Sequence, residues 1–196
     1  MEREKLIRFL LSSGLMSRPQ AEEIAGQFQP RTLERNAFLL QAGRVSDEYL
    51  FLDRGLLRAF VHDADGNDVT TGFFSGGHVA LEFASFFNRT PSQEHLQALT
   101  DCAGWFITYA QLNALFHARP EFREFGRSVL VRGLITLKSR MLNQITETAT
   151  ARYESLLKTN PEILLHAPLK HVASYLGVTD SSLSRIRAGA KEAGGT

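Results

Sequence analysis

The apolar residues of the chain change their spacing twice, and the changes divide the chain into three parts. From Glu2 to Phe28, apolar side chains recur every three or four residues, as they do on one face of a helix. Pro19 lies just after Ser17, at a position where proline commonly opens a helix. Two short helices are therefore predicted in this first part.

The second part, from Arg31 to about Ile107, consists of short apolar runs separated by turn-forming residues. The breaks fall at Asn36, Gly43, Gly55, Asp65-Gly66 and Gly76-Gly77. Asp65 and Gly66 both tolerate positive φ and lie between LLRAFVHD and NDVTTGFF, so a hairpin is predicted there. Many short strands at near-even spacing predict an antiparallel barrel or roll.

Helical spacing returns at Pro120 and continues to about residue 148. A coiled-coil seam with spacings of four, three and four is formed by Leu130, Leu134, Leu137 and Met141. A second apolar stripe beside it consists of Val131, Ile135, Leu142 and Ile145. A helix with two apolar faces needs two partners, which are predicted to be its own roll and the same helix of another subunit. A helix buried within a monomer is the alternative.

The last part has the spacing of short helices that meet at tight turns. One amphipathic helix is predicted over Ala151–Lys158, with a break at Asn160-Pro161. Further on, Gly177 suits the left-handed residue that ends a helix, and Thr179 is a competent N-cap for the next one. The residues predicted to hold these two helices together are Leu169, Val172, Ala173, Leu176, Val178, Leu183 and Ile186.

The second of these helices is predicted to begin with polar side chains that point outward. They are Asp180, Ser181, Ser182 and Arg185. A recognition helix carries its contacts to base edges at this place. The charge distribution agrees, because the chain has 11 Lys and Arg against 14 Asp and Glu up to Arg119, and 11 against 7 from Pro120 onward. An acidic sensor joined to a basic DNA-binding tail has this asymmetry.

The composition excludes several kinds of cysteine site and argues against a secreted or membrane protein. The 196 residues contain one cysteine, Cys102, so no disulfide, cysteine-only zinc site or four-cysteine iron–sulfur cluster can form within one chain. A reducing compartment is expected. The N-terminus has neither the long apolar core of a signal peptide nor that of a membrane span. The protein is therefore expected to be cytoplasmic, with no membrane partner.

The segment PLKHVASYLGVTDSSLSRIR resembles the helix-turn-helix of the CRP/FNR family, the cyclic AMP receptor protein and its relatives. The order of Gly43, FLDRGLLRAFVHDADGNDVTTGFFSGG, CAGWFI and the long helix is similar to the cyclic-nucleotide-binding roll and dimer helix of that family. The resemblance covers nearly the whole chain. It implies an α+β fold: a sensor β-roll with N-terminal helices over 1–119, a dimerisation helix over 120–148, and a helix-turn-helix over 149–196.

The resemblance also implies a homodimeric transcription regulator. Its base readers match Asp180, Ser181 and Arg185, and the guanidinium of Arg185 can pair bidentately with guanine O6 and N7. The other residues expected to contact DNA are Thr179, Ser182, Lys170, Arg187 and Lys191. The implied partners are double-stranded DNA, a second copy of the chain, RNA polymerase and a small-molecule effector that the sequence does not identify. Residues 188–196 are expected to be too few for the family's β-hairpin wing, which would lower DNA affinity.

The expected ligand pocket departs from the family pattern. Where nucleotide-binding members have an arginine followed by small residues, this chain has Ser92, Gln93 and Glu94. An acidic residue there would repel a phosphate, so no response to cyclic AMP is expected. The candidate pocket residues are Glu82, which matches the ribose ligand of the family, together with Arg89, Thr90 and Ser92.

No motif of a known enzyme class, cofactor or metal site is present in the sequence. His78 and Glu82 lie close together, as in a metal-dependent enzyme of cupin type, but neither HxH nor HExxH occurs. The chain is therefore expected to be no enzyme and to carry no metal or cofactor. The alternative to a DNA-binding regulator is a ligand-binding regulatory module without functional DNA binding.

Overall fold

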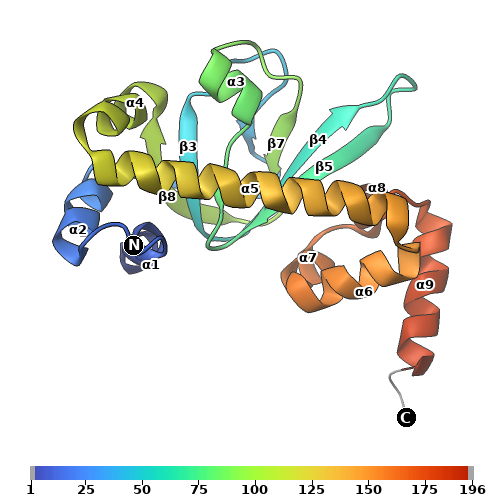
Figure 1. The fold of residues 1–196 in the computed structure, drawn as a ribbon. Helices are drawn as coiled ribbons and strands as arrows, with labels where there is room; N and C mark the ends of the chain where they lie inside the picture. The colour runs from blue at the N-terminus through green and yellow to red at the C-terminus, as the bar shows by residue number, and fades with distance from the viewer. Residues whose placement is uncertain (1–2, 194–196) are drawn as a thin grey trace.

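The computed structural model describes the backbone of residues 3–193 and the side chains of residues 3–189. A β-roll lies above a long helix, two short helices lie at the N-terminal end, and a helical unit lies at the other end (Figure 1). The α+β fold expected from the sequence is confirmed.

The roll consists of two four-stranded antiparallel sheets. In hydrogen-bonding order, the first contains β1 (Gln29–Leu33), β8 (Cys102–Thr108), β3 (Glu48–Arg54) and β6 (Val79–Ala80). The second contains β2 (Phe38–Leu40), β7 (His95–Ala98), β4 (Leu56–His62) and β5 (Asp68–Ser75). Leu50 and Leu52 of β3 pack with Leu57 of β4, so the alternating residues of both sheets form one apolar core.

The hairpin predicted at Asp65-Gly66 joins β4 to β5, but its turn differs from the expected one. Gly66 has φ 82°, whereas Asp65 is not in the left-handed region. The carboxylate of Asp63 instead accepts hydrogen bonds from the backbone N–H of Asp65 (3.0 Å) and of Asn67 (2.8 Å). An aspartate side chain therefore replaces the second positive-φ residue in closing this loop.

Two helices precede the roll, as predicted: α1 (Glu4–Leu11) and α2 (Arg18–Gly26). A capping box joins Ser17 and Gln20 at the start of α2, with Ser17 N donating to Gln20 Oε1 at 2.8 Å. Both helices pack on β3 and β8. Two further helices are not predicted by the residue pattern: α3 (Phe83–Asn88) is shorter than two turns, and α4 (Tyr109–Ala118) buries only Leu112 and Leu115.

The long helix α5 (Pro120–Thr146) contacts the roll mainly through its first turns. Phe122 and Phe125 are buried there, and Gly126 lies so close to the ring of Phe116 that a Cβ would be 2.6 Å from it. Farther along, both predicted apolar stripes are exposed, including Leu134 (67%) and Ile145 (74%).

The expectation that one of the two apolar faces of α5 is buried against the roll is therefore wrong, because the helix buries only its first turns there and the stripe residues are 44–74% exposed. A helix buried within a monomer is excluded as well. The two stripes lie side by side and are largely exposed in the described structure, although Leu130 and Leu137 also border a cavity along β5.

The C-terminal unit contains α6 (Ala149–Thr159), α7 (Pro161–His166), α8 (Leu169–Leu176) and α9 (Asp180–Ala193). Pro161 does end the preceding helix, as predicted, but it also starts α7 at once. Leu56 and Leu99 of the roll join Tyr153, Val172 and Leu176 in one buried cluster. The helical unit is thus packed on the roll rather than joined to it only through α5.

Candidate nucleic-acid interface and nucleotide cradle

Helices α8 and α9 meet at Gly177, which has φ 69° and ψ 37°. Gly177 N donates to Ser174 O (3.1 Å) and Val178 N donates to Ala173 O (3.0 Å), so the last carbonyls of α8 are hydrogen-bonded. Thr179 Oγ1 accepts from Ser182 N at 3.2 Å at the start of α9. The predicted glycine turn and N-cap are confirmed.

The crossing of the two helices is held by the residues that the sequence predicted. Ala173 and Leu183 are fully buried, and Val172 and Leu176 are nearly so. Leu169, Val178 and Ile186 are partly buried against the same cluster. Because Ala173 is small, α9 can cross close to α8 at this point. The geometry is that of a helix-turn-helix unit.

The opposite side of α9 is polar and exposed. Asp180, Ser181 and Arg185 are exposed, and Ser182 is half-buried because it takes part in the cap. The guanidinium of Arg185 donates only to Ser181 O (3.4 Å) and Ser182 Oγ (3.3 Å) and forms no ion pair among the described residues. Its charge is therefore available to a partner. In Figure 1, α9 lies at the end of the molecule farthest from α1 and α2.

The other candidate DNA contacts have different surroundings. Lys170 is exposed at the start of α8, Thr179 is exposed before α9, and Arg187 is half-buried. The side chain of Lys191 lies outside the described residues. Among the described side chains, Lys170 and Arg185 therefore provide exposed positive charge on this surface.

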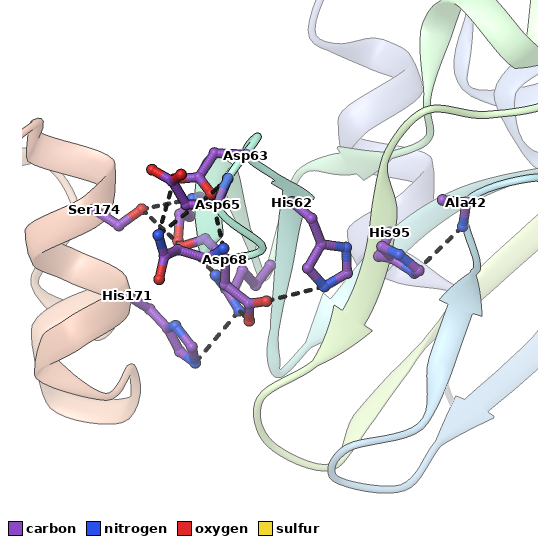
Figure 2. A network of polar contacts seen from close by, with 11 residues as sticks. Ala42, His62, Asp63, Asp65, Asp68, His95, His171 and Ser174 are labelled. Atoms are coloured by element: carbon purple, nitrogen blue, oxygen red, sulfur yellow. Dashed lines mark hydrogen bonds and ion pairs between the residues drawn. The ribbon is translucent and has the colours of Figure 1, made fainter.

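A buried arginine of the roll holds α8 in place. Arg58 of β4 is 1% exposed and pairs with Asp68 of β5 at 3.0 Å. It donates to Thr70 Oγ1 at 2.9 Å and lies 3.5 Å from His171 Nε2 on α8. Figure 2 shows His171 and Ser174 on α8 directed toward the hairpin that carries Asp68. The roll and the helix-turn-helix unit therefore share one polar network.

Helix α8 is also held on two sides by hydrogen bonds between side chains and backbone groups. Ser174 Oγ accepts a hydrogen bond from the backbone N–H of Thr70 at 2.7 Å. At the end of α8, Arg152 Nη2 donates to Leu176 O at 2.9 Å and Gln144 Nε2 donates to Tyr175 O at 3.3 Å. A cation beside the last carbonyls of a helix is stabilising because the macrodipole is negative there.

Burial and the charge of Arg58 lower the pKa of His171 to about 4, so the imidazole is neutral near pH 7. A neutral imidazole can accept from Arg58, whereas an imidazolium would place two cations together. Burial raises the pKa of Asp68, but the hydrogen bond from Arg58 and the positive charge around Asp68, that of Arg58 first, bring the pKa below its ordinary value. Asp68 is therefore ionised and compensates the buried guanidinium.

The candidate cradle for a cyclic nucleotide lies around α3, and its polar side chains already have partners within the chain. Glu82 caps α3 by accepting from Ala84 N (2.9 Å) and Ser85 N (2.7 Å). Ser92 is buried, where its Oγ donates to Glu94 O at 2.8 Å. The Glu82 carboxylate is thus engaged by the protein's own backbone.

Arg89 has a comparable structural role. It ends α3 in the left-handed region with φ 57°, and it pairs with Asp47 at 2.7 Å. It also donates to Ser46 O (2.7 Å) and stacks on the ring of Tyr109. The carbonyl of Thr90, which follows, accepts from Ser85 Oγ at 2.6 Å. The four candidate cradle residues, Glu82, Arg89, Thr90 and Ser92, thus all form hydrogen bonds that shape α3 and the loop after it.

Three residues that connect the roll to α8 are not predicted from the sequence: Arg58, His171 and Arg140. Arg58 in LLRAF interrupts an apolar strand, which is a signal of a buried and paired charge, but its partner Asp68 could not be identified without the pairing of β4 and β5. In the described part of the chain, no three His, Cys, Asp or Glu side chains converge as metal ligands would. Nor does any helix there combine the length and apolar character needed to cross a bilayer.

Comparisons with known proteins agree with this geometry. Residues 30–119 match the family model of the cyclic nucleotide-binding domain. No curated protein sequence matches the chain. The structure is similar to FixK2 of Bradyrhizobium japonicum, with a TM-score of 0.74 and 16% identity over 85% of this chain and 86% of that one.

Two further solved structures share the fold. The c-di-GMP-responsive global regulator CLP of Xanthomonas campestris gives a TM-score of 0.69 at 16% identity, over 91% of this chain and 93% of that one. The catabolite activator protein of Thermus thermophilus gives 0.59 at 16% identity, over 95% and 88%. The resemblance drawn from the sequence is thus confirmed: residues 30–119 match the cyclic nucleotide-binding domain model, and the chain has the fold of the CRP/FNR transcription regulators.

Proposed function

We propose that the chain is a cytoplasmic, homodimeric, sequence-specific DNA-binding transcription regulator that does not respond to cyclic AMP. The observation that carries the proposal is the exposed polar side of α9, beside a helix crossing that is fully buried. Arg185 supplies a guanidinium without an ion-pair partner among the described residues. A bidentate pair with guanine is the contact that such a group makes in a major groove.

The exposed apolar face of α5 supports the homodimer. Leu134 and Met141 of the predicted seam are exposed, as is Ile135 beside them. Monomeric proteins rarely expose a large continuous apolar face, and pairing with the same helix of a second copy would cover it. A twofold dimer would place two copies of α9 in successive major grooves, about 34 Å apart.

The cradle supports the absence of a cyclic AMP response. Glu82 and Arg89 are occupied by contacts within the chain, and no arginine replaces the missing phosphate clamp at Ser92. A cavity of about 410 Å³ beside the cradle is lined by Asp47 and Glu48 as well as Arg44. Both carboxylates are already paired, Asp47 with Arg89 and Glu48 with Arg31, so this wall is built from ion pairs within the chain rather than from a free phosphate clamp.

Selection of duplexes from a random pool followed by an electrophoretic mobility shift tests the proposal. We expect an enriched sequence with two half-sites whose centres are about one helical turn apart. Equal binding of selected and random duplexes would contradict sequence-specific recognition. Absence of any shift would favour the alternative, a ligand-binding regulatory module without DNA binding.

A further inference from the structure

Helix α8 packs on the outer side of the second sheet, against β4 and β5. Leu57 and Ala59 of β4 belong to the apolar core of the roll, and Arg58 between them points to the opposite side, toward α8. On β5, Thr70 N donates to Ser174 Oγ at 2.7 Å. This hydrogen bond joins the two units directly, because Thr70 belongs to the roll and Ser174 to the helix-turn-helix unit.

The guanidinium of Arg58 is a buried cation with little compensation at this contact. Its ion-pair partner, the carboxylate of Asp68, is itself 39% exposed. The Nη2 atom of Arg58 has no hydrogen-bond partner among the described residues, and the ring of Phe60 lies 4.2 Å from the guanidinium carbon. A second positive charge placed beside this group would therefore be costly.

His171 of α8 occupies the place where such a charge would arise. Its side chain is 9% exposed, and its Nε2 atom lies 3.5 Å from Arg58 Nη1. A guanidinium can only donate, so this contact requires an unprotonated Nε2 that accepts. Protonation would replace the acceptor by a second donor and set an imidazolium against the guanidinium. The docked geometry is therefore matched to a neutral His171.

Charged groups from α8 itself and from three other elements surround His171. The carboxylate of Asp68 is already shared between Arg58 and the imidazole of His62, which lies 3.2 Å from it (Figure 2). Burial and the nearby cations outweigh the carboxylates, so the pKa of His171 falls to about 4. The charged groups that act on it are Arg58 of β4, Lys170 of α8, Asp68 of β5 and Asp180 of α9.

We propose that this contact is an acid-sensitive latch, in which protonation of His171 undocks α8 from β4 and β5 while the roll and the helices stay folded. A proton taken up from solvent at Nε2 removes the acceptor of Arg58, and undocking lets water solvate both cations. The hydrogen bond from Thr70 to Ser174 is lost in the same step. The latch is a contact within the chain, so its test does not depend on DNA binding.

The expected size of the effect follows from the two pKa values of His171. The pKa is about 4 in the docked chain and about 6.5 for an imidazole in water. Undocking therefore takes up a proton in this range, and its equilibrium constant should rise roughly tenfold from pH 7.5 to pH 5.5. The apolar cluster that Leu56 of the roll shares with Val172 opposes undocking, so the undocked form is a minor one.

Amide hydrogen exchange of the full chain, measured by NMR at the two pH values and corrected for the intrinsic exchange rates, detects such a minor form. The amide of Thr70 reports undocking because its acceptor lies on α8. The amides of β3, which is paired with both β8 and β6, report unfolding of the roll.

We expect the opening constant of the Thr70 amide to exceed that of the β3 amides at both pH values and to rise roughly tenfold at pH 5.5. An opening constant that does not change with pH would overturn the proposal. So would equal opening constants at Thr70 and in β3, because the roll would then unfold rather than release the helix.

Two variants assign the proton to one histidine. His171→Gln keeps an oxygen that accepts from Arg58 but does not titrate, so the opening constant of Thr70 should be equal at both pH values. His62→Gln is the matched control, because His62 also contacts Asp68 but is 52% exposed on the roll. The tenfold rise should remain in this variant.

A rise that persists in His171→Gln, or that disappears in His62→Gln, would overturn the assignment to His171. An NMR titration of the His171 imidazole in the native chain checks the assignment without any substitution. Its midpoint should lie near pH 4, and a midpoint at pH 6.5 or above would overturn the latch.

Discussion

Helices α8 and α9 lie side by side in one helix-turn-helix, yet their polar groups have opposite surroundings. Those of α8 are engaged: His171 contacts Arg58, Ser174 accepts from Thr70, and its last carbonyls are bound by side chains of α5 and α6. Those of α9 are largely unengaged, with Arg185 exposed above its own first turn. One helix fixes the orientation of the unit on the roll, and the other leaves described side chains such as Arg185 free on the surface.

The largest effect is expected when the homodimer is broken, because the second helix-turn-helix unit is then lost from the assembly. Leu134→Glu together with Leu137→Glu places charges on the apolar face of α5, so a folded monomer is expected that no longer binds a two-half-site operator. Analytical ultracentrifugation at tens of micromolar measures the assembly, at a concentration where an interface of about 1,200 Å² or more should hold. A monomeric native chain at that concentration would contradict the homodimer.

The next largest effect is a difference in the free energy of unfolding between a change at the contacts that hold α8 and a change on the exposed side of α9. Arg58→Leu leaves Asp68 without its cation and removes the contact with His171, so the free energy of unfolding should fall by about 1–3 kcal/mol. Arg185→Ala should change it by less than about 0.5 kcal/mol, because the side chain is exposed. Urea unfolding monitored by circular dichroism measures both. Equal losses would remove the distinction between the two helices.

Acid should weaken the anchored helix in a defined range. The pKa of His171 is about 4 in the folded chain, against about 6.5 when unfolded. Between these values the unfolded chain binds a proton that the folded chain does not, so the free energy of unfolding falls as the pH drops from about 6.5 to about 4. His171→Asn should flatten this part of the stability profile, and an unchanged profile would show that another group is responsible.

The smallest effect concerns the cradle. Cyclic AMP and cyclic GMP at millimolar concentration should leave Tm unchanged, since a ligand far below its dissociation constant adds almost no stability. Differential scanning fluorimetry measures this. Glu82→Ala should lower stability by about 1 kcal/mol through loss of the cap on α3, with or without nucleotide. A clear rise in Tm with either nucleotide would mean that the cradle has been assigned to the wrong residues.

The comparison also shows which parts of the site could be predicted from sequence. The glycine turn, the N-cap and the buried crossing depend on contacts within about twenty residues, so the local pattern of small, apolar and polar residues determines them. The anchor of α8 depends on Arg58 and Asp68, which lie more than a hundred residues away from His171. Nothing in the local pattern around either segment indicates that pairing.

The long helix illustrates the same limit. Its length and its apolar seam could be predicted from residue spacing, and the position of Pro120 marked its start. The side of the helix that faces the roll could not, because it is set by Phe122, Phe125 and Gly126 packing against α4 and the N-terminal helices. These early contacts leave both apolar stripes largely exposed, with Leu130 and Leu137 bordering a cavity along β5, and they leave Arg140 facing Thr71.

The specificity of Arg185 tests the central claim most directly. Binding of native chain and Arg185→Ala is measured against selected and random duplexes over a range of salt concentrations, with Lys170→Ala as control. Arg185→Ala should cost about 1 to 3 kcal/mol on the selected duplex and relax the preference at one base pair of each half-site. Lys170→Ala should weaken both duplexes alike and flatten the salt dependence. An unchanged ratio of selected to random affinity in Arg185→Ala would contradict the role assigned to α9.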